Sequence, residues 1–244
     1  TELAFGTLRM RGLLDAVLAR CVDRPLDRID PSLLDLLRLG AYQLLEMRVP
    51  PHAAVGESVS LARDVRGEGP SRLTNAVLRK VAARDREAWL AAVVEGVGDE
   101  SERLAITTSH PAWVVRALGE AMADGDAAEL EALLLTDNVA PRVTLAARPG
   151  RASVAELEQS ADVEPGRWSP YAAVLRSGPP GDVLAVRENR AGVQDEGSQV
   201  VALTLAAAPL DGGPDARWLD LSAGPGGKAA LLAGLAAERG AALT

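Results

Sequence analysis

The amino-acid sequence predicts a mainly helical first part, an α+β stretch in the middle and, at the end, the beginning of a Rossmann-like α/β domain. Three observations carry this prediction. Apolar residues recur at helical spacing over residues 1–135. Strand-like runs and Gly/Pro turns interrupt that pattern over residues 136–195. A short apolar strand, a glycine-rich turn and an Ala/Leu helix follow one another over residues 217–239, as in one unit of an α/β sheet.

The composition excludes several classes of protein. Of the 244 residues, 48% are hydrophobic and 25% are charged, which is typical of a soluble globular protein. Cys21 is the one cysteine, which excludes an internal disulfide framework and a multi-cysteine zinc site, and two histidines leave little for another metal site. The longest run without a charge, residues 197–210, is shorter than the roughly 20 apolar residues that cross a membrane. We therefore expect a cytoplasmic protein with no membrane segment and no metal.

The net charge of −8 is unevenly distributed along the chain. Residues 91–137 hold 2 basic and 10 acidic residues, whereas residues 1–90 hold 14 basic and 12 acidic residues. The acidic total is therefore only a weak argument against nucleic-acid binding by the first part. Two interpretations of its cations stay open, an RNA-facing patch and a solvated surface of mixed charge. The cations in question are Arg9, Arg11, Arg38, Arg72, Arg79, Lys80, Arg84 and Arg86.

Helix boundaries in the first part follow from capping residues and prolines. Asp30 followed by Pro31 is a helix start, because an acid caps the free N–H groups and proline suits the first turn. The helix that begins there is expected to stop at Pro50-Pro51. The same reasoning places further helices at residues 52–65, near residues 73–81, from Ser109 or His110 with Pro111, and at residues 124–135.

The middle and the end of the chain are predicted to alternate strands and helices. Residues 142–147 (RVTLAA) are strand-like, residues 153–159 are a short helix candidate, and residues 183–186 are a strand candidate after a Gly/Pro turn. Further expectations are a helix over residues 198–207, a loop over 209–214, a buried strand over 217–221, a glycine turn over 222–228 and a helix over 229–239.

The glycine turn is the strongest local indication of a ligand. Ligands of open α/β sheets bind beyond the carboxyl ends of the strands, where glycines let the backbone approach and the next helix presents free N–H groups. A nucleoside triphosphate loop is rejected because Ser222 and Ala223 stand where glycine is needed and Ala229 replaces the magnesium-binding hydroxyl. A dinucleotide site beginning at Gly224, an S-adenosylmethionine site and a turn that merely connects strand to helix stay open.

The residues of this turn also resemble a known motif. Residues 220–228 (DLSAGPGGK) are similar to the S-adenosylmethionine motif of RNA 5-methylcytosine methyltransferases, D-x-[CS]-A-A-P-G-G-K-T. Residues 194–199 (QDEGSQ) resemble the QDxxSQ segment before it, and residues 109–113 (SHPAW) resemble the opening of the connector in the same family. Segments that resemble a NusB-like domain lie at residues 4–9, 37–44, 49–55 and 75–79. Taken in order, these segments resemble the RsmB/Sun-type 16S rRNA cytosine-C5 methyltransferases over essentially the whole chain.

The resemblance implies four parts. They are a NusB-like helical RNA-binding domain (residues 1–90), an acidic helical connector (91–137), an α+β RNA-binding subdomain (138–195) and the start of the S-adenosylmethionine-dependent methyltransferase domain (196–244). The chain is expected to be a piece cut at both ends.

The implied activity is methyl transfer from S-adenosyl-L-methionine to C5 of a cytosine in 16S rRNA. The resemblance places the methyl donor on Ser222, Ala223, Gly224, Pro225, Gly226, Gly227 and Lys228. Gly224 and Ala229 depart from the family, which usually has alanine and threonine there. The family's two catalytic cysteines would follow beyond residue 244, so no catalytic residue is assigned and the 244-residue chain alone is expected to be inactive. The alternative is a NusB-like RNA- or protein-binding module without catalysis.

Several single residues keep two interpretations each. Lys228 is expected either to neutralise the donor's carboxylate or to face solvent, and Asp220 and Asp195 either to serve the donor pocket or to cap their own loop and helix. Cys21 is expected to be a buried structural thiol rather than a nucleophile, and Trp113 is expected in the core rather than as a platform for base stacking.

Overall fold

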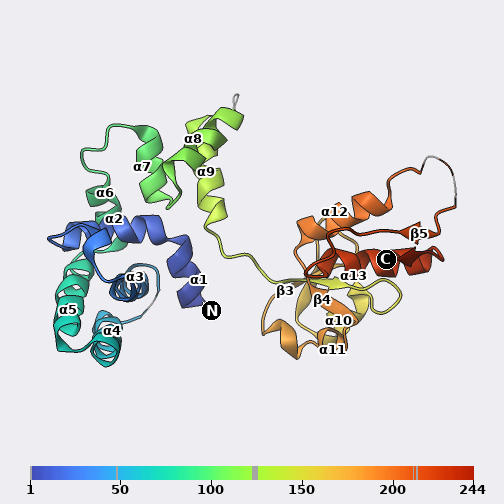
Figure 1. Cartoon of the computed structure of the whole chain (residues 1–244), viewed down its shortest axis with the longest axis horizontal. Coiled ribbons are helices and arrows are strands. Elements are labelled where there is room, and N and C mark those ends of the chain that lie inside the picture. Colours follow the sequence, from blue (N-terminus) through green and yellow to red (C-terminus); the bar gives the residue numbers. More distant parts are fainter. Residues whose placement is uncertain (1, 48, 123–125, 211, 213) are drawn as a thin grey trace. The chain divides into compact units, whose positions relative to one another are not determined.

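The computed structural model describes residues 2–47, 49–122, 126–210, 212 and 214–244. The chain divides into two units, Thr1–Ala140 and Pro141–Thr244, which are described separately below (Figure 1). Unit 1 is helical, and unit 2 contains a four-stranded and a two-stranded sheet with helices. The predicted fold class is therefore confirmed, whereas the boundaries of the four expected parts stay a prediction.

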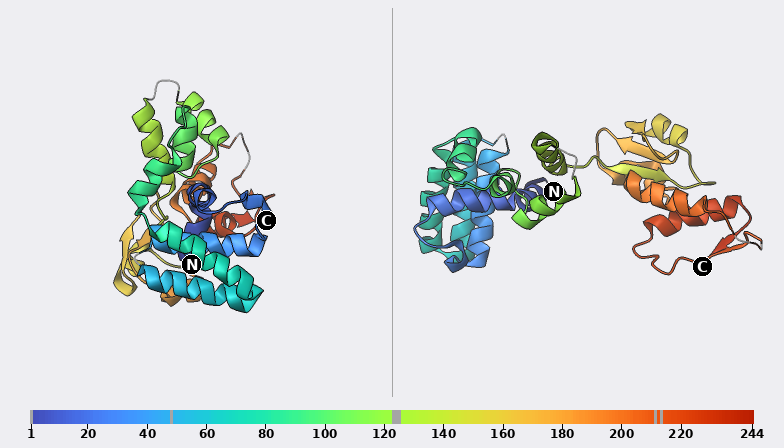
Figure 2. Two further views of the ribbon diagram at one scale, coloured as in Figure 1. Left: turned by 90° about the vertical axis from the view of Figure 1, so that its left-hand side faces the viewer. Right: turned by 90° about the horizontal axis from the view of Figure 1, so that it is seen from above.

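In its described residues, unit 1 consists of short and medium helices around one main core (Figure 2). The core is formed chiefly by leucines of the second, third and fifth α-helices, such as Leu14, Leu37 and Leu78, which are fully buried. A second cluster around Val115 and Leu134 joins the last three helices. The helices are α1 (Glu2–Arg9), α2 (Arg11–Cys21), η1 (Leu26–Arg28), α3 (Pro31–Leu45), α4 (Pro51–Arg66), α5 (Glu68–Ala82), α6 (Arg86–Val93), α7 (Glu100–Thr107), α8 (Ala112–Ala121) and α9 (Ala127–Asp137).

The helix starts of unit 1 follow the capping chemistry of the sequence. Asp30 Oδ1 accepts hydrogen bonds from the backbone N–H groups of Ser32 (3.0 Å) and Leu33 (3.2 Å), so α3 begins where the sequence predicts. Helix α5 is longer than predicted and includes Pro70, because the backbone nitrogens of a first turn need no hydrogen bond and proline is tolerated there. Part of the helix predicted over 124–135 lies outside the described residues; α9 begins after Asp126, which accepts from Glu129 N (2.8 Å).

Unit 2 contains a four-stranded antiparallel sheet in the order β2-β3-β1-β4. Strand β1 pairs on both sides, with Leu145 opposite Ala173 of β3 and opposite Val193 of β4. The elements are β1 (Thr144–Ala147), α10 (Val154–Ser160), β2 (Val163–Pro165), β3 (Ala172–Leu175), η2 (Pro180–Asp182), α11 (Leu184–Arg187), β4 (Ala191–Val193), α12 (Glu196–Ala206), β5 (Arg217–Trp218), α13 (Gly227–Glu238) and β6 (Ala242–Leu243).

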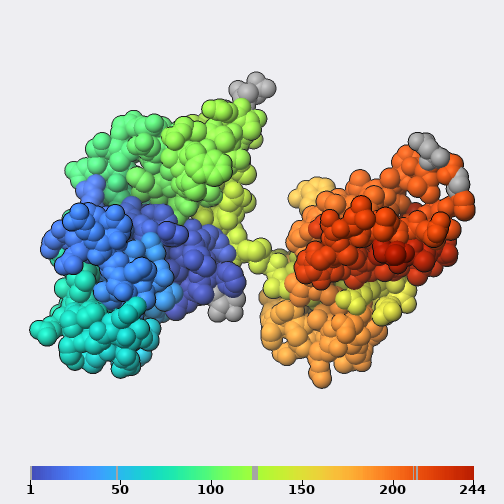
Figure 3. All heavy atoms as spheres, viewed as in Figure 1, coloured from blue at the N-terminus to red at the C-terminus, as the bar shows by residue number. Residues whose placement is uncertain are grey.

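The last part of unit 2 forms the beginning of an α/β arrangement. Helices α12 and α13 pack together through Ala202, Ala206 and Leu231, and Figure 3 shows them in orange and red on the surface of this unit. Strand β5 pairs in parallel with β6, with Trp218 opposite Leu243. A parallel strand, a glycine turn and a helix therefore follow one another as predicted.

Three predictions about burial and strands are wrong. Residues 183–186 do not form a strand; Val183 precedes the short helix α11, in which Arg187 N donates to Val183 O (3.1 Å) and so satisfies the backbone locally. The strand predicted over 217–221 ends at Trp218, and Leu221 is 88% exposed because it already belongs to the exposed turn. Trp113 is 69% exposed rather than in the core.

Candidate functional site

The glycine turn links β5 to α13 and is held by the carboxylate at its start. Asp220 Oδ1 accepts a hydrogen bond from Ser222 N (2.9 Å), and Asp220 N donates to Thr244 O (3.1 Å) beside β6. Asp220 thus has the loop-capping role that its position allowed. The turn residues 222–225 are exposed rather than packed into the protein, so their backbone is accessible to a ligand.

Gly226 ends the turn in a backbone conformation that favours glycine. Its φ of +113° lies in the region that side chains with a Cβ rarely adopt, and no atom lies within 4 Å of a Cβ built there or on Gly224. In the described structure no side chain caps the start of α13. The first N–H groups of this 12-residue helix are therefore available to a ligand, and the positive end of the helix dipole faces the same place.

Two adjoining hollows of unit 2 border the glycine turn. The first, here the turn hollow, has a volume of about 480 Å³ and is lined by all the predicted binding residues except Gly226. The second, here the strand hollow, has a volume of about 360 Å³ and is lined by the ends of β1 and β4 and by residues 225–227. Gln194 and Gly227 are among the residues that line both hollows. The structure thus brings the predicted turn residues together at one accessible site.

The start of α12 forms the opposite side of the turn hollow. Asp195 Oδ1 accepts from Ser198 N (2.9 Å) and caps α12, so the capping interpretation of this residue is confirmed. Hydrogen bonds from the Ser198 hydroxyl and backbone hold the pKa of Asp195 below its ordinary value of 3.8, and the charge of Lys228 acts in the same direction. Lys228 itself is exposed. The Lys228 ammonium and the Asp195 carboxylate, which caps α12, therefore both border this hollow.

Gln194 contributes to the site a buried side-chain nitrogen that lacks a hydrogen-bond partner. The residue is 9% exposed, and within the described structure its Nε2 has no hydrogen-bond partner. A Cβ built on Gly227 would lie 3.8 Å from that nitrogen, which places the amide next to the start of α13. The sequence motif included Gln194 without indicating that its side chain would be left free.

Gln199, from the same motif, has a structural role. It is fully buried, its Nε2 donates to Gln194 O (3.0 Å), and its Oε1 accepts from Ser169 Oγ (2.7 Å). These bonds connect α12 to the end of β4 and to the loop before β3. Gln199 does not line either hollow.

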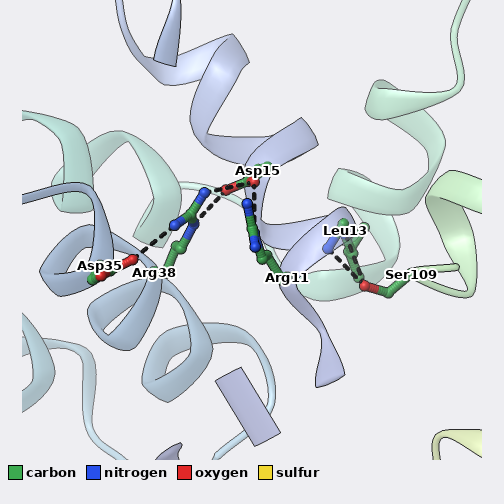
Figure 4. A network of polar contacts seen from close by, with 7 residues as sticks. Arg11, Leu13, Asp15, Asp35, Arg38 and Ser109 are labelled. Carbon is green, nitrogen blue, oxygen red and sulfur yellow. Dashed lines mark hydrogen bonds and ion pairs between the residues drawn. The ribbon is translucent and has the colours of Figure 1, made fainter. Parts of the chain in front are cut away.

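In unit 1, several of the cations that could form an RNA-facing patch are engaged in ion pairs. Arg38 binds both carboxylate oxygens of Asp15 (2.7 and 2.8 Å) and Asp35 Oδ1 (2.7 Å), as Figure 4 shows. These carboxylates, Asp15 above all, raise the pKa of Arg38, and its side chain is only 12% exposed. Arg11 faces the same Asp15 at 3.7 Å. Arg38 is thus a structural residue rather than a phosphate ligand.

Other cations of the predicted patch have local partners as well. Arg86 pairs with Glu46 (2.7 Å), and Lys80 Nζ donates to Cys21 O (3.0 Å). Arg84 lies over the Trp89 ring at 5.1 Å, whereas Arg72 is exposed on α5. The surface is therefore of mixed character, which the count of arginines did not reveal.

Cys21 is a buried structural thiol, as expected. It lies in the core of unit 1 at 2% exposure, and burial raises its pKa despite the charges of Lys80 and Arg84. Within the described ranges no group of three or more His, Cys, Asp or Glu side chains is placed to hold a metal ion. The helices described here include none with the length and apolar character of a membrane span.

Comparisons with known proteins agree with this architecture. Residues 1–83 match the model of the NusB family. A putative methyltransferase of Mycobacterium tuberculosis (strain H37Rv) is 46% identical over 100% of this chain and 53% of its own length. The probable ribosomal RNA small subunit methyltransferase B of Bacillus subtilis is 31% identical over 98% of this chain and 52% of its length. The protein named ribosomal RNA small subunit methyltransferase B in Pseudomonas syringae is 35% identical over 93% and 48%, respectively.

A solved structure shares the fold. The structure titled "Crystal Structure of PH0851" superposes with a TM-score of 0.74 and 19% sequence identity, over 100% of this chain and 53% of that one. The chain spans about half the length of the curated relatives that it matches.

Proposed function

We infer that this chain, in which residues 1–83 form a NusB-family domain, is part of a ribosomal RNA methyltransferase of the RsmB/Sun type. We propose that the whole protein transfers a methyl group from S-adenosyl-L-methionine to C5 of a cytosine in 16S rRNA. The observation that carries this proposal is the exposed glycine turn between a parallel strand and the uncapped start of α13. A substrate of this kind would place the protein in the cytoplasm.

The residues of the site fit this methyl donor. The backbone at Gly224 and Gly226 leaves the space of a side chain open, and the orphaned Gln194 amide lies beside the turn. In our proposal Ser222–Lys228 hold the donor, and Lys228 lies near its carboxylate. The donor would supply a methyl group on a positively charged sulfur. Asp220 keeps the turn in shape through Ser222, and Asp195 keeps α12 in place through Ser198.

Unit 1 would position the RNA. Exposed cations such as Arg72 and Arg79 are available on α5, although Arg79 also donates to Asn75 Oδ1 (3.1 Å). Unpaired loop bases are the expected target, because duplex RNA hides its base edges. Contacts of arginine with phosphate would make the affinity fall with rising salt.

The first test is donor binding by glycine variants of the full-length gene product. In Gly226→Ala the turn relaxes to another conformation, because an L-residue at φ +113° is strained, and binding must restore the original one. We expect roughly tenfold weaker binding of S-adenosylmethionine by calorimetry, since left-handed backbone costs about 1–2 kcal/mol.

Gly240→Ala is the matched control for that variant. Gly240 also has a positive φ (+72°), but it follows the far end of α13. Its variant should lose a similar amount of stability and keep the affinity of the unmodified protein. Equal affinities of the two variants would contradict donor binding at the turn.

The 244-residue chain by itself is predicted to transfer no methyl group. Its one cysteine, Cys21, is buried in unit 1 and cannot serve as the nucleophile. Tritium transfer from S-adenosylmethionine to rRNA by this chain would overturn the prediction.

The alternative, a binding module without catalysis, is supported by the NusB-family match of residues 1–83. In that case, unit 1 alone (residues 1–140) would bind RNA or a protein partner as tightly as the whole chain. Electrophoretic mobility shifts with rRNA over a series of salt concentrations compare the RNA affinity of unit 1 alone with that of the whole chain. Affinity that needs unit 2 would favour the methyltransferase.

A further inference from the structure

The side-chain amide of Gln194 is a buried donor with nothing to donate to. Its backbone is fixed: Gln194 N donates to Thr144 O (3.0 Å), and Gln194 O accepts from Gln199 Nε2 (3.0 Å). The side chain is therefore held next to β1, at 9% exposure, without a partner for Nε2 among the described residues. A buried amide without a hydrogen bond destabilises a protein, and a bound ligand would supply the acceptor that this amide lacks.

The position of this amide indicates which ligand group it faces. Gln194 lines both the turn hollow and the strand hollow, and its amide lies beside Gly227 in the first turn of α13. The free N–H groups of that turn and the ammonium of Lys228 are donors and positive charges at the same place.

One oxygen of each acidic group beside the turn hollow is already engaged. Asp195 accepts from Ser198 N and Asp220 accepts from Ser222 N, so each carboxylate is bound to its own loop or helix. The donors that remain at the start of α13 are its free N–H groups, Lys228 and Gln194 Nε2, and donors at a helix start suit an anion.

We propose that Gln194 Nε2 donates a hydrogen bond to the carboxylate at the methionine end of S-adenosylmethionine. Gln194 would thereby select a methyl-donating ligand that carries this carboxylate. The proposal rests on the proposed function of the turn. It makes Gln194 a specificity-determining residue of the donor site, and it gives the unpaired amide a partner when the ligand binds.

The test compares two ligands that differ in the carboxylate. Binding of S-adenosylmethionine and of decarboxylated S-adenosylmethionine to the full-length gene product is measured by calorimetry for the unmodified protein, Gln194→Leu and Gln159→Leu. Gln159 is an exposed glutamine on α10 and serves as the matched control. We expect Gln194→Leu to bind S-adenosylmethionine roughly 10- to 100-fold more weakly, the range for a hydrogen bond to a charged group. Its affinity for the decarboxylated ligand should stay unchanged.

A second readout separates this role from a structural one. Leucine replaces an unpaired buried amide in Gln194→Leu, so the ligand-free variant should unfold at the same or a higher temperature than the unmodified protein. Gln199→Leu, which removes three hydrogen bonds in the core, should unfold at a clearly lower temperature. A ligand-free Gln194→Leu that unfolds earlier would overturn the proposal.

The other outcomes are equally decisive. Equal weakening for both ligands, or unchanged affinity for S-adenosylmethionine, rejects the contact between Gln194 and the carboxylate while the proposed function stands. An unmodified protein that binds neither ligand rejects the proposed function, and the Gln194 contact with it.

Discussion

The guanidinium of Arg38 shows, at the scale of a residue, how partners decide what a charge can do. Arg38 was one of the cations for which the sequence left open an RNA-facing patch or a solvated surface, yet it binds Asp15 and Asp35 and is largely buried. Arg63 makes an ion pair of the same length, 2.7 Å with Glu68, but its side chain is 52% exposed. The two arginines have the same chemistry and different energetics, because solvent weakens an exposed pair.

Loss of Arg38 is predicted to destabilise unit 1 far more than loss of Arg63. Arg38→Ala leaves Asp15 without its two close hydrogen bonds and should lower the free energy of unfolding by about 2–3 kcal/mol. Arg63→Ala should cost less than about 1 kcal/mol. Urea unfolding of both variants measures the difference, and similar losses would contradict a structural role for Arg38.

At the scale of an element, α2 receives its cap from a residue far away in the sequence. Ser109 Oγ accepts from Gly12 N (2.8 Å) and Leu13 N (3.2 Å), in the first turn of α2 (Figure 4). The sequence predicted that Ser109 or His110 starts the next helix, but α8 begins after Pro111. Ser109 therefore connects the segment between α7 and α8 to α2.

This long-range cap predicts different effects for two substitutions. Ser109→Ala removes the acceptor and should cost about 1 kcal/mol, as at other helix starts. Ser109→Gly also removes it but relieves the positive φ of +59° at this position, so its loss should be smaller. Thermal unfolding of unit 1 orders the variants, and a glycine variant less stable than the alanine variant would be evidence against this account.

The cap of α12 makes a pH-dependent contribution. The pKa of Asp195 is lowered from 3.8 in the folded protein, chiefly by the Ser198 hydroxyl, so folding favours the ionised carboxylate. Its contribution to stability is therefore complete above about pH 5 and is lost as the pH falls through 3.8 and the lower folded pKa.

Asp195→Asn isolates this contribution, because asparagine keeps a capping oxygen without the charge. We expect the unfolding temperatures of the unmodified protein and the variant to differ at about pH 6 and to converge toward about pH 2.5. A difference that is constant over this range would show that ionisation of Asp195 contributes nothing.

At the scale of the whole molecule, each unit has its own buried clusters. Leu14 and Leu134 lie in the clusters of unit 1, whereas Leu145 and Leu231 lie in those of unit 2. Each described cluster of buried apolar residues stays within one unit. Burial of apolar surface is the main source of stability, and each unit buries its own apolar residues.

Independent unfolding of the two units is the prediction at this scale. Calorimetry of the 244-residue chain should show two transitions, and residues 1–140 expressed alone should reproduce one of them. Arg38→Ala should shift only that transition. One cooperative transition for the whole chain, moved as a unit by Arg38→Ala, would contradict independent folding.

The sequence by itself determined the features that depend on neighbouring residues. Asp30 caps α3, the glycine turn leads into α13, and Asp195 and Asp220 accept from N–H groups two or three residues away. Capping, proline positions and positive φ values act over a few residues, so a local pattern is sufficient to predict them. The predicted turn residues also meet at one site because they are contiguous.

Only the tertiary structure decided which of these residues have partners far along the chain. The exposure of Leu221 and Trp113, the pairing of Arg38 with Asp15, the capping of α2 by Ser109 and the free amide of Gln194 all depend on such contacts. The physical reason is that burial and hydrogen-bond satisfaction are properties of a place in space. That place is filled by elements dozens of residues apart, which no local pattern specifies.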